Sequence, residues 1–286
     1  MSLDNEWFSE AMADQGLAFS LQVRRKLHEE RTPYQLIEVY ETTHWGNLMV
    51  IDGAIMVTGK DNFLYHEMMS HPVLFTHPDP RRVLIIGGGD CGMLREVLRH
   101  PGVERATQVD IDEGVTRASQ LYFPELCESN SDPRADLRFE DGVKYIRNVP
   151  AGSVDVVIVD STDPVGPAVG LFKPNFFREV RRALAPDGLL CQQSESPLLH
   201  LDSILKELHD NMRSAGFDRV ATLQYPMPSY PAGWWSATIA GRGKPLNVFR
   251  ESDAASRPFE TRYYNPAMHK AALAVPAFCA GVFVDQ

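Results

Sequence analysis

The first part of the chain alternates hydrophobic and polar residues in short runs, a pattern typical of strands with one buried face. Between residues 17 and 58 these runs are LAFSLQV, YQLIEVYET and GNLMVIDGAIMVTG. Asp52-Gly53 interrupts the third run and predicts a tight hairpin turn. We therefore predict a small N-terminal β domain over residues 1–60.

The pattern changes after residue 60. NFLYHEMMSHPVLF predicts a helix that Pro72 kinks or ends. Short apolar runs then alternate with helical stretches. The predicted strands are VLIIG, ATQVDID, LRFED, DVVIVD, GLLCQQS, RVATLQY and WWSATIAG, and the predicted helices are 91–99, 113–122, 143–148, 175–184 and 201–215.

This alternation predicts an α/β fold over residues 61–286, with a Rossmann-like, doubly wound and mostly parallel sheet. No helix separates the last two predicted strands, so we expect one antiparallel strand at the end of the sheet.

Acidic side chains follow the first five predicted strands of this sheet. In doubly wound sheets, ligands bind beyond the carboxyl ends of the strands, so these side chains are expected in one site. They are Asp90, Asp110, Asp141, the pair Asp160 and Asp163, and Glu195.

The loop Gly87–Gly92 has the glycine spacing of dinucleotide-binding sites, and Asp110 is placed to bind ribose hydroxyls. Asp90 argues against a dinucleotide, because a carboxylate about 4 Å from a pyrophosphate costs about 4 kcal/mol at an effective dielectric of 20. That cost removes most of a useful affinity. A nucleoside without phosphates fits better, with Asp141 near the adenine amino group.

An S-adenosyl compound is such a nucleoside. In S-adenosylmethionine, the methionine carboxylate would be repelled by Asp90, while its ammonium would be attracted. The chain of decarboxylated S-adenosylmethionine ends in the ammonium and has no carboxylate. We therefore expect Asp90 to bind this donor and to discriminate against the commoner cofactor.

Composition and charge agree with a small cationic substrate. The chain has 28 Lys and Arg residues and 38 Asp and Glu residues, a net charge of −10, which argues against nucleic-acid binding. The first residues, MSLDNEWFSE, contain no apolar run, and we expect no signal peptide and no membrane association. The four cysteines are scattered without a CxxC motif, which favours a reducing compartment, and we expect a cytoplasmic protein.

Taken together, these motifs resemble those of the polyamine aminopropyltransferases, above all the spermidine synthases. The matching segments are YQLIEVYET, DNFLYHEMM, VLIIGGGDCGMLREVL, VDID, DG at 141–142, DSTDPVGPA and SYPAGWWS. The resemblance implies a class I methyltransferase-like fold and transfer of an aminopropyl group from decarboxylated S-adenosylmethionine, as co-substrate, to putrescine. The products would be spermidine and methylthioadenosine. It also implies that no metal is required and that the N-terminal domain mediates a homodimer or homotetramer.

The resemblance also implies residue roles. Asp160 would be the catalytic base. The donor would be bound by Gln35, Gly87, Gly88, Gly89, Asp90, Asp110, Asp141, Gly142 and Pro167. The amine would be bound by Tyr65, His66, Asp90, Asp160, Asp163, Glu195 and Tyr230. The family usually has glycine at position 91, where this chain has Cys91, which affects the packing of the loop.

An alkyl amine has a pKa near 10.4, so the attacking nitrogen must lose a proton. We expect Asp160 to accept it, directly or through water, and Tyr65 to steer this transfer. Asp163 or Glu195 would anchor the distal ammonium. Residues 161–173 and SYPAGWWS are candidate lids, and within the latter Trp234 and Trp235 are candidates for stacking on the substrate.

Alternative interpretations remain at this point. His66 and His71 stand five residues apart, which places them on different sides of a helix and disfavours a metal site. Cys91 at a helix start is a candidate nucleophile, although the neighbouring Asp90 opposes thiolate formation. An amine N-methyltransferase, an NAD-type or non-catalytic binding protein, and an acceptor other than putrescine, such as cadaverine or spermidine, are the competing functions.

Overall fold

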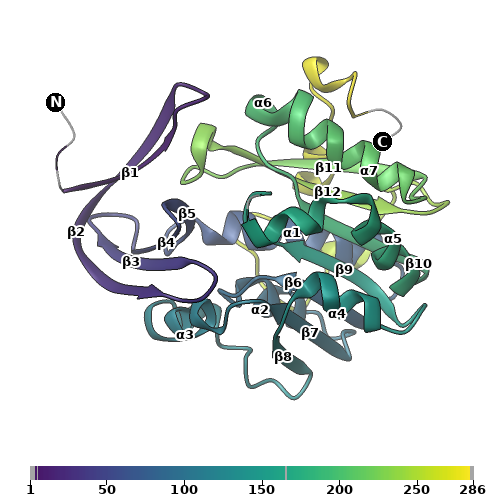
Figure 1. The fold of residues 1–286 in the computed structure, drawn as a ribbon. Helices are drawn as coiled ribbons and strands as arrows, with labels where there is room; N and C mark the ends of the chain where they lie inside the picture. The colour runs from purple at the N-terminus through teal and green to yellow at the C-terminus, as the bar shows by residue number, and fades with distance from the viewer. Residues whose placement is uncertain (1–3, 5, 165, 284–286) are drawn as a thin grey trace.

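The computed structural model describes residues 4, 6–164 and 166–283, which form two β-sheets (Figure 1). The first sheet is antiparallel, with its strands in chain order. Its strands are β1 (Trp7–Met12), β2 (Leu17–Arg31), β3 (Leu36–Thr42), β4 (Asn47–Ile51) and β5 (Ala54–Thr58). The three runs LAFSLQV, YQLIEVYET and GNLMVIDGAIMVTG predicted β2 to β5, but β1 was not predicted. As an edge strand it has no fully buried residue, and its hydrophobic pattern is correspondingly weak.

The turn between β4 and β5 confirms the predicted hairpin. Asp52 and Gly53 both have positive φ, 48° and 89°, as a two-residue turn of this kind requires. The Asp52 carboxylate also accepts a hydrogen bond from the Leu36 N–H at 2.9 Å, which ties the turn to β3.

The second sheet confirms the α/β prediction. Its strand order is β11-β12-β10-β9-β6-β7-β8, and β6 to β10 run parallel. The strands are β6 (Arg82–Gly87), β7 (Arg105–Asp110), β8 (Ala135–Phe139), β9 (Val154–Asp160), β10 (Leu184–Gln193), β11 (Arg219–Pro226) and β12 (Trp234–Gly241). β12 is antiparallel, but it lies between β10 and β11 and not at the edge of the sheet.

Helices cover both faces of this sheet. They are α1 (Asn62–Thr76), α2 (Gly92–Leu98), α3 (Glu113–Tyr122), α4 (Gly142–Asn148), α5 (Pro174–Ala183), α6 (Pro197–His200), α7 (Lys206–Ser214), α8 (Glu251–Ala255) and α9 (Pro266–Ala272), with a π turn at Leu201–Leu205. Of the two predicted effects of Pro72, a kink or an end of the first helix, the end is wrong, because α1 continues to Thr76. Within the described residues, no helix is long and apolar enough to cross a membrane.

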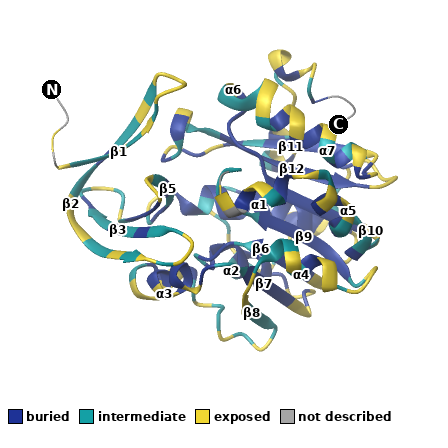
Figure 2. Cartoon of the chain, viewed as in Figure 1, coloured by how far each residue is buried: buried dark blue, intermediate teal, exposed yellow. Residues whose placement is uncertain are grey.

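The buried strands present alternate residues to two separate cores. Val83 and Ile85 of β6 pack with α1, α2 and the C-terminal helices, while Leu84 and Ile86 pack with α5 and α7. Figure 2 shows the resulting band of buried strands between the two helical layers. Because both faces are covered, these strands read as continuous apolar runs in the sequence.

α3 connects the two sheets. Its Val115 and Ala118 pack against Ile37, Met49 and Val57 of the N-terminal sheet. This contact fixes the N-terminal sheet beside the carboxyl ends of the parallel strands, as Figure 1 shows.

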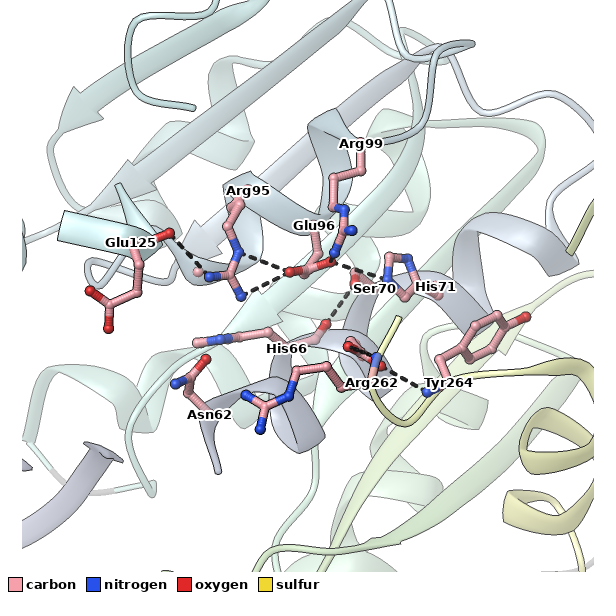
Figure 3. A network of polar contacts seen from close by, with 12 residues as sticks. Asn62, His66, Ser70, His71, Arg95, Glu96, Arg99, Glu125, Arg262 and Tyr264 are labelled. Atoms are coloured by element: carbon pink, nitrogen blue, oxygen red, sulfur yellow. Dashed lines mark hydrogen bonds and ion pairs between the residues drawn. The ribbon is translucent and has the colours of Figure 1, made fainter. Parts of the chain in front are cut away.

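A buried polar network fastens α1 to the C-terminal segment (Figure 3). The Glu67 carboxylate accepts hydrogen bonds from the backbone N–H groups of Arg262, Tyr263 and Tyr264 at 2.8, 2.9 and 2.8 Å. Glu67 is buried. These three bonds fix α1 at the residue next to His66.

α2 is joined to α1 by a second buried carboxylate. Glu96 lies 3.2 Å from the His71 ring, 2.8 Å from Arg95 and 3.0 Å from Arg99 (Figure 3). Burial acts to raise the pKa of Glu96, but His71 and the two arginines outweigh it and hold this pKa far below its usual value. Glu96 is therefore ionised in the folded protein.

We predict that Glu67→Ala lowers the free energy of unfolding by about 3 kcal/mol, because three buried N–H groups lose their acceptor. Urea denaturation measures this change. The control is Glu104→Ala, which removes an acid that is 63% exposed and is expected to change stability by less than about 0.5 kcal/mol. Equal effects of the two substitutions would contradict the role of Glu67.

Candidate active site

A cavity opens at the carboxyl ends of the parallel strands, where residues of both sheets meet. Most of the predicted site residues line it. They are Gln35, Tyr65, Gly87, Gly88, Gly89, Asp90, Asp110, Asp141, Gly142, Asp160, Asp163, Glu195 and Tyr230. His66 does not line this cavity, and the side chain of Pro167, in the turn Gly166–Phe172, lies outside the described part of the structure.

The glycine loop brings β6 close to the end of β9. Gly87 and Gly88 have φ values of 84° and 70°, and a Cβ atom on Gly87 would lie 2.0 Å from the carbonyl oxygen of Asp160. The Gly88 N–H donates to this same oxygen at 2.8 Å. Only glycine permits this approach, which places the loop beside Asp160.

Asp90 lines the cavity, but two contacts hold its carboxylate in place. One oxygen accepts a hydrogen bond from the Gly92 N–H at 2.8 Å, and the other lies 3.0 Å from His66 Nε2. Burial acts to raise the pKa of Asp90, but His66 and the Gly92 N–H outweigh it and lower this pKa. Asp90 therefore presents an ionised carboxylate to the cavity.

His66 lies behind Asp90. It is 2% exposed, and a Cβ atom on Gly92 would collide with its ring. Burial acts to lower the pKa of His66, but the charge of Asp90 and its hydrogen bond outweigh burial and raise this pKa. In this position the ring orients the Asp90 carboxylate.

Asp160 stands at the end of β9 with one strong partner. The Tyr65 hydroxyl donates a hydrogen bond to Asp160 Oδ1 at 2.6 Å. Burial, followed by the charge of Asp90, raises the pKa of Asp160 to about 7. The pKa of Tyr65 is raised well above 10, mainly by burial, so its hydroxyl remains a donor. Asp160 can therefore exchange a proton near neutral pH.

One end of the cavity is lined by Asp110 and Asp141, two further predicted acids, together with Gln35. Burial raises the pKa of Asp110 to about 6. Asp141 caps α4 by accepting hydrogen bonds from the backbone N–H groups of Val143 and Lys144. The Gln35 amide donates to Asp112 at 3.0 Å, so this contact fixes Gln35 at the cavity wall.

Further carboxylates line the end of the cavity away from these residues. Glu195 is 1% exposed and has a φ of 67°, and burial, followed by Asp163, raises its pKa well above the ordinary value. Glu10 of β1 lines the same end, and burial raises its pKa to about 7. Sequence reasoning missed Glu10, because β1 gives too weak a pattern to place its residues.

The structure distinguishes the two candidate tryptophans. Trp235 lines the cavity and is 7% exposed, whereas Trp234 packs against Phe278. Trp235 also contacts Tyr230, whose ring lies beside Tyr65. An aromatic wall thus faces Asp160.

The two histidines of HEMMSH have different partners. His66 contacts Asp90, whereas His71 contacts Glu96 and His100. In the described parts of the chain, no group of three or more His, Cys, Asp or Glu side chains is arranged to hold a metal ion.

Comparisons with known proteins gave matches over most of the chain. The family model of the spermine/spermidine synthase domain matches residues 62–250, and that of the spermidine synthase tetramerisation domain matches residues 6–59. A polyamine aminopropyltransferase of Alkalilimnicola ehrlichii is 64% identical over 286 residues, which is all of both chains. One from Thioalkalivibrio sulfidiphilus is 61% identical and covers 97% of this chain and 98% of its own.

The chain belongs to the polyamine aminopropyltransferase family. A crystal structure of a spermidine synthase in complex with the transition state analogue AdoDATO has a TM-score of 0.93 and 32% identity, covering 99% of this chain and 96% of that one. The spermidine synthase of Thermotoga maritima has a TM-score of 0.91 and 33% identity, covering 97% and 94%. These neighbours confirm the predicted fold class, and the protein is an aminopropyltransferase.

We predict that kcat/KM of this aminopropyltransferase falls about tenfold per pH unit below pH 7, because protonated Asp160 cannot accept a proton. The acceptor amine, with a pKa near 10.4, titrates well above this range. Tyr65→Phe tests whether the inflection belongs to Asp160. Since the Tyr65 hydrogen bond lowers the pKa of Asp160, the inflection should move to higher pH in this variant, while the amine titrates as before. An unmoved inflection would exclude Asp160 as its source.

Proposed function

We propose that the chain transfers the aminopropyl group of decarboxylated S-adenosylmethionine to putrescine, giving spermidine and methylthioadenosine. The observation that carries this proposal is the placement of Asp90 and Asp160 in one cavity, with Glu10, Asp163 and Glu195 at its far end. The first pair suits a cationic donor and a proton transfer, and the distal acids suit a second ammonium group. The family, and the AdoDATO complex of a similar spermidine synthase, support the same reaction.

The donor is proposed to bind along the carboxyl ends of β6 and β7. Asp110 would bind the ribose hydroxyls, and Asp141 with Gly142 would face the adenine. Asp90 would bind the ammonium of the aminopropyl chain. Gly87, Gly88, Gly89, Gln35 and Pro167 would complete the donor site.

The acceptor is proposed to lie between Asp160 and the distal acids. Tyr65, Tyr230 and the neighbouring Trp235 would enclose its methylene chain. Asp163 and Glu195 would bind its far ammonium. His66, which contacts Asp90 and does not line the cavity, would act through Asp90 and not through direct contact with the amine.

The proposed chemistry is an in-line displacement. Asp160 accepts a proton from the attacking amine. The neutral nitrogen then attacks the aminopropyl carbon that is bonded to the sulfonium sulfur. The carbon–sulfur bond breaks, and the thioether of methylthioadenosine leaves with the electron pair. Holding nitrogen, carbon and sulfur in line lowers the entropic part of the barrier.

The alternatives weighed from the sequence have less support. An N-methyltransferase would bind intact S-adenosylmethionine, whose carboxylate would lie close to the ionised Asp90. An NAD-type site would place a pyrophosphate beside the same charge. Cadaverine and spermidine are the competing acceptors, which product analysis distinguishes from putrescine.

The organisation of the protein completes the proposal. We propose a homodimer or homotetramer that assembles through the N-terminal domain, which is supported by the match of residues 6–59 to a tetramerisation domain. A division at residue 60 is supported by the two family matches, which meet between residues 59 and 62. The four free cysteines support the proposed location in the cytoplasm.

We predict that Asp160→Asn lowers kcat by at least about 100-fold, because the amine loses its proton acceptor. Calorimetry should show donor affinity within about threefold of wild type, a difference below ~1 kcal/mol. Asp187→Asn, which changes an acid that is 53% exposed, is the matched control and should keep full activity. Near-normal turnover in Asp160→Asn would remove the proposed base.

We predict that a panel of amines will give spermidine from putrescine as the preferred product. Putrescine is expected to exceed cadaverine and spermidine by about tenfold in kcat/KM, since the extra methylene group of cadaverine and the extra aminopropyl group of spermidine must displace the distal ammonium from its acids. Mass analysis of the products with the decarboxylated donor measures this preference. Preference for spermidine would make the protein a spermine-forming enzyme, and methylated amines from intact S-adenosylmethionine would overturn the proposal.

A further inference from the structure

Two thiols lie against the loop that carries Asp90. Cys91 follows Asp90 directly, is fully buried and has a φ of 68°, a conformation that favours glycine. Cys127 follows the short turn Pro124–Leu126 and is half-buried. Neither thiol has a role in the reaction proposed above.

The contacts of the two thiols converge on the loop. Cys91 Sγ donates to the carbonyl oxygen of Gly89 at 3.6 Å, and Cys127 Sγ donates to the carbonyl oxygen of Asp90 at 3.7 Å. The Asn130 amide donates to Cys91 Sγ at 3.3 Å and also hydrogen bonds to Cys127. The two sulfur atoms therefore share one neighbour and support adjacent peptide groups.

Cys127 also affects the ionisation of the Cys91 thiol. A hydrogen bond from Cys127 is the main cause that lowers the pKa of the Cys91 thiol, and the amides of Asn130 and Gln108 act in the same direction. Gln108 Nε2 lies 3.7 Å from Cys91 Sγ. Cys91 thus has more thiolate character than a buried thiol in apolar surroundings, and thiolates are the reactive form.

The other two cysteines have different surroundings. Cys191 is buried in the core of the second sheet, and burial, followed by Asp160, raises its pKa. Cys279 is buried beside Leu205 and Phe283. These positions provide controls within the same chain.

We propose that Cys91 and Cys127 are a peroxide-sensitive pair whose oxidation to a disulfide disables the binding of the donor's ammonium by Asp90. A peroxide oxidises one thiol to a sulfenic acid, and water is released. The second thiol gives up its proton as it attacks that sulfur, the S–S bond forms and a second water leaves, so that two thiols and one hydrogen peroxide give one disulfide and two waters. A thiol reductant reverses the step.

The effect on Asp90 follows from the geometry of the bond. Two bonded sulfur atoms stand about 2.05 Å apart, much closer than two thiols in contact. The disulfide has no S–H group, so the Asp90 carbonyl loses the donor that Cys127 supplies. The short S–S bond and the lost S–H donor displace the peptide groups on either side of the Asp90 side chain. The Asp90 carboxylate then loses the position that its contacts with Gly92 and His66 define.

The experiment treats the purified full-length protein with hydrogen peroxide and maps the disulfide by mass spectrometry of peptides. We expect a linked pair of peptides containing Cys91 and Cys127, with the loss of two hydrogen atoms. Donor KM should rise at least about tenfold, or ~1.4 kcal/mol in binding, and dithiothreitol should restore it. The mass readout requires no substrate, so it tests the pair even if the proposed reaction is wrong.

Cys127→Ser should keep basal activity and become resistant to peroxide, whereas the control Cys279→Ser should stay as sensitive as wild type. Cys91→Gly, which suits the positive φ, is the second variant and should also resist oxidation. The proposal is overturned if no linked peptides form, if the disulfide forms without a change in donor KM, or if both variants lose activity to peroxide as the wild type does.

Discussion

Several carboxylates buried in one cavity are the constraint on which this site depends. Removing a charge from water is unfavourable, and neighbouring charges of the same sign add to the cost. The pKa values of Asp110 and Asp160 are raised to about 6 and 7 in consequence. A cationic ligand lowers this electrostatic cost, so the charges that disfavour the free site favour the binding of the proposed cationic donor and acceptor.

The scaffold makes this arrangement possible by fixing each acid separately. Asp90 is held by the Gly92 N–H and His66, and Asp160 by Tyr65. Both His66 and Tyr65 lie on α1. The hydrogen bonds of Glu67 and the ion pairs of Glu96 join this helix to the rest of the domain. Acids that repel one another thus keep defined positions, as a displacement reaction with strict alignment requires.

Much of this architecture could be predicted from the sequence, because it depends on local patterns. Alternating apolar runs and helical stretches predicted the parallel sheet, and Asp52-Gly53 predicted the hairpin. The carboxyl ends of parallel strands meet at one edge, so the positions of Asp90, Asp110 and Asp160 in the sequence already implied one site. The motifs around these residues also indicated the family, because they are short segments that can be read directly from the sequence.

The tertiary structure alone decided how residues that are distant in the sequence act on one another. It placed His66 behind Asp90, brought Glu10 of an unpredicted edge strand into the cavity, and set Cys127 against the loop that carries Cys91. It also let α1 continue through Pro72 and inserted β12 within the sheet. Hydrophobic periodicity records which face of an element is buried, but not which side chain of another element meets it. The sequence by itself therefore determined the elements and the acids at their ends, while packing decided their partners and their charge.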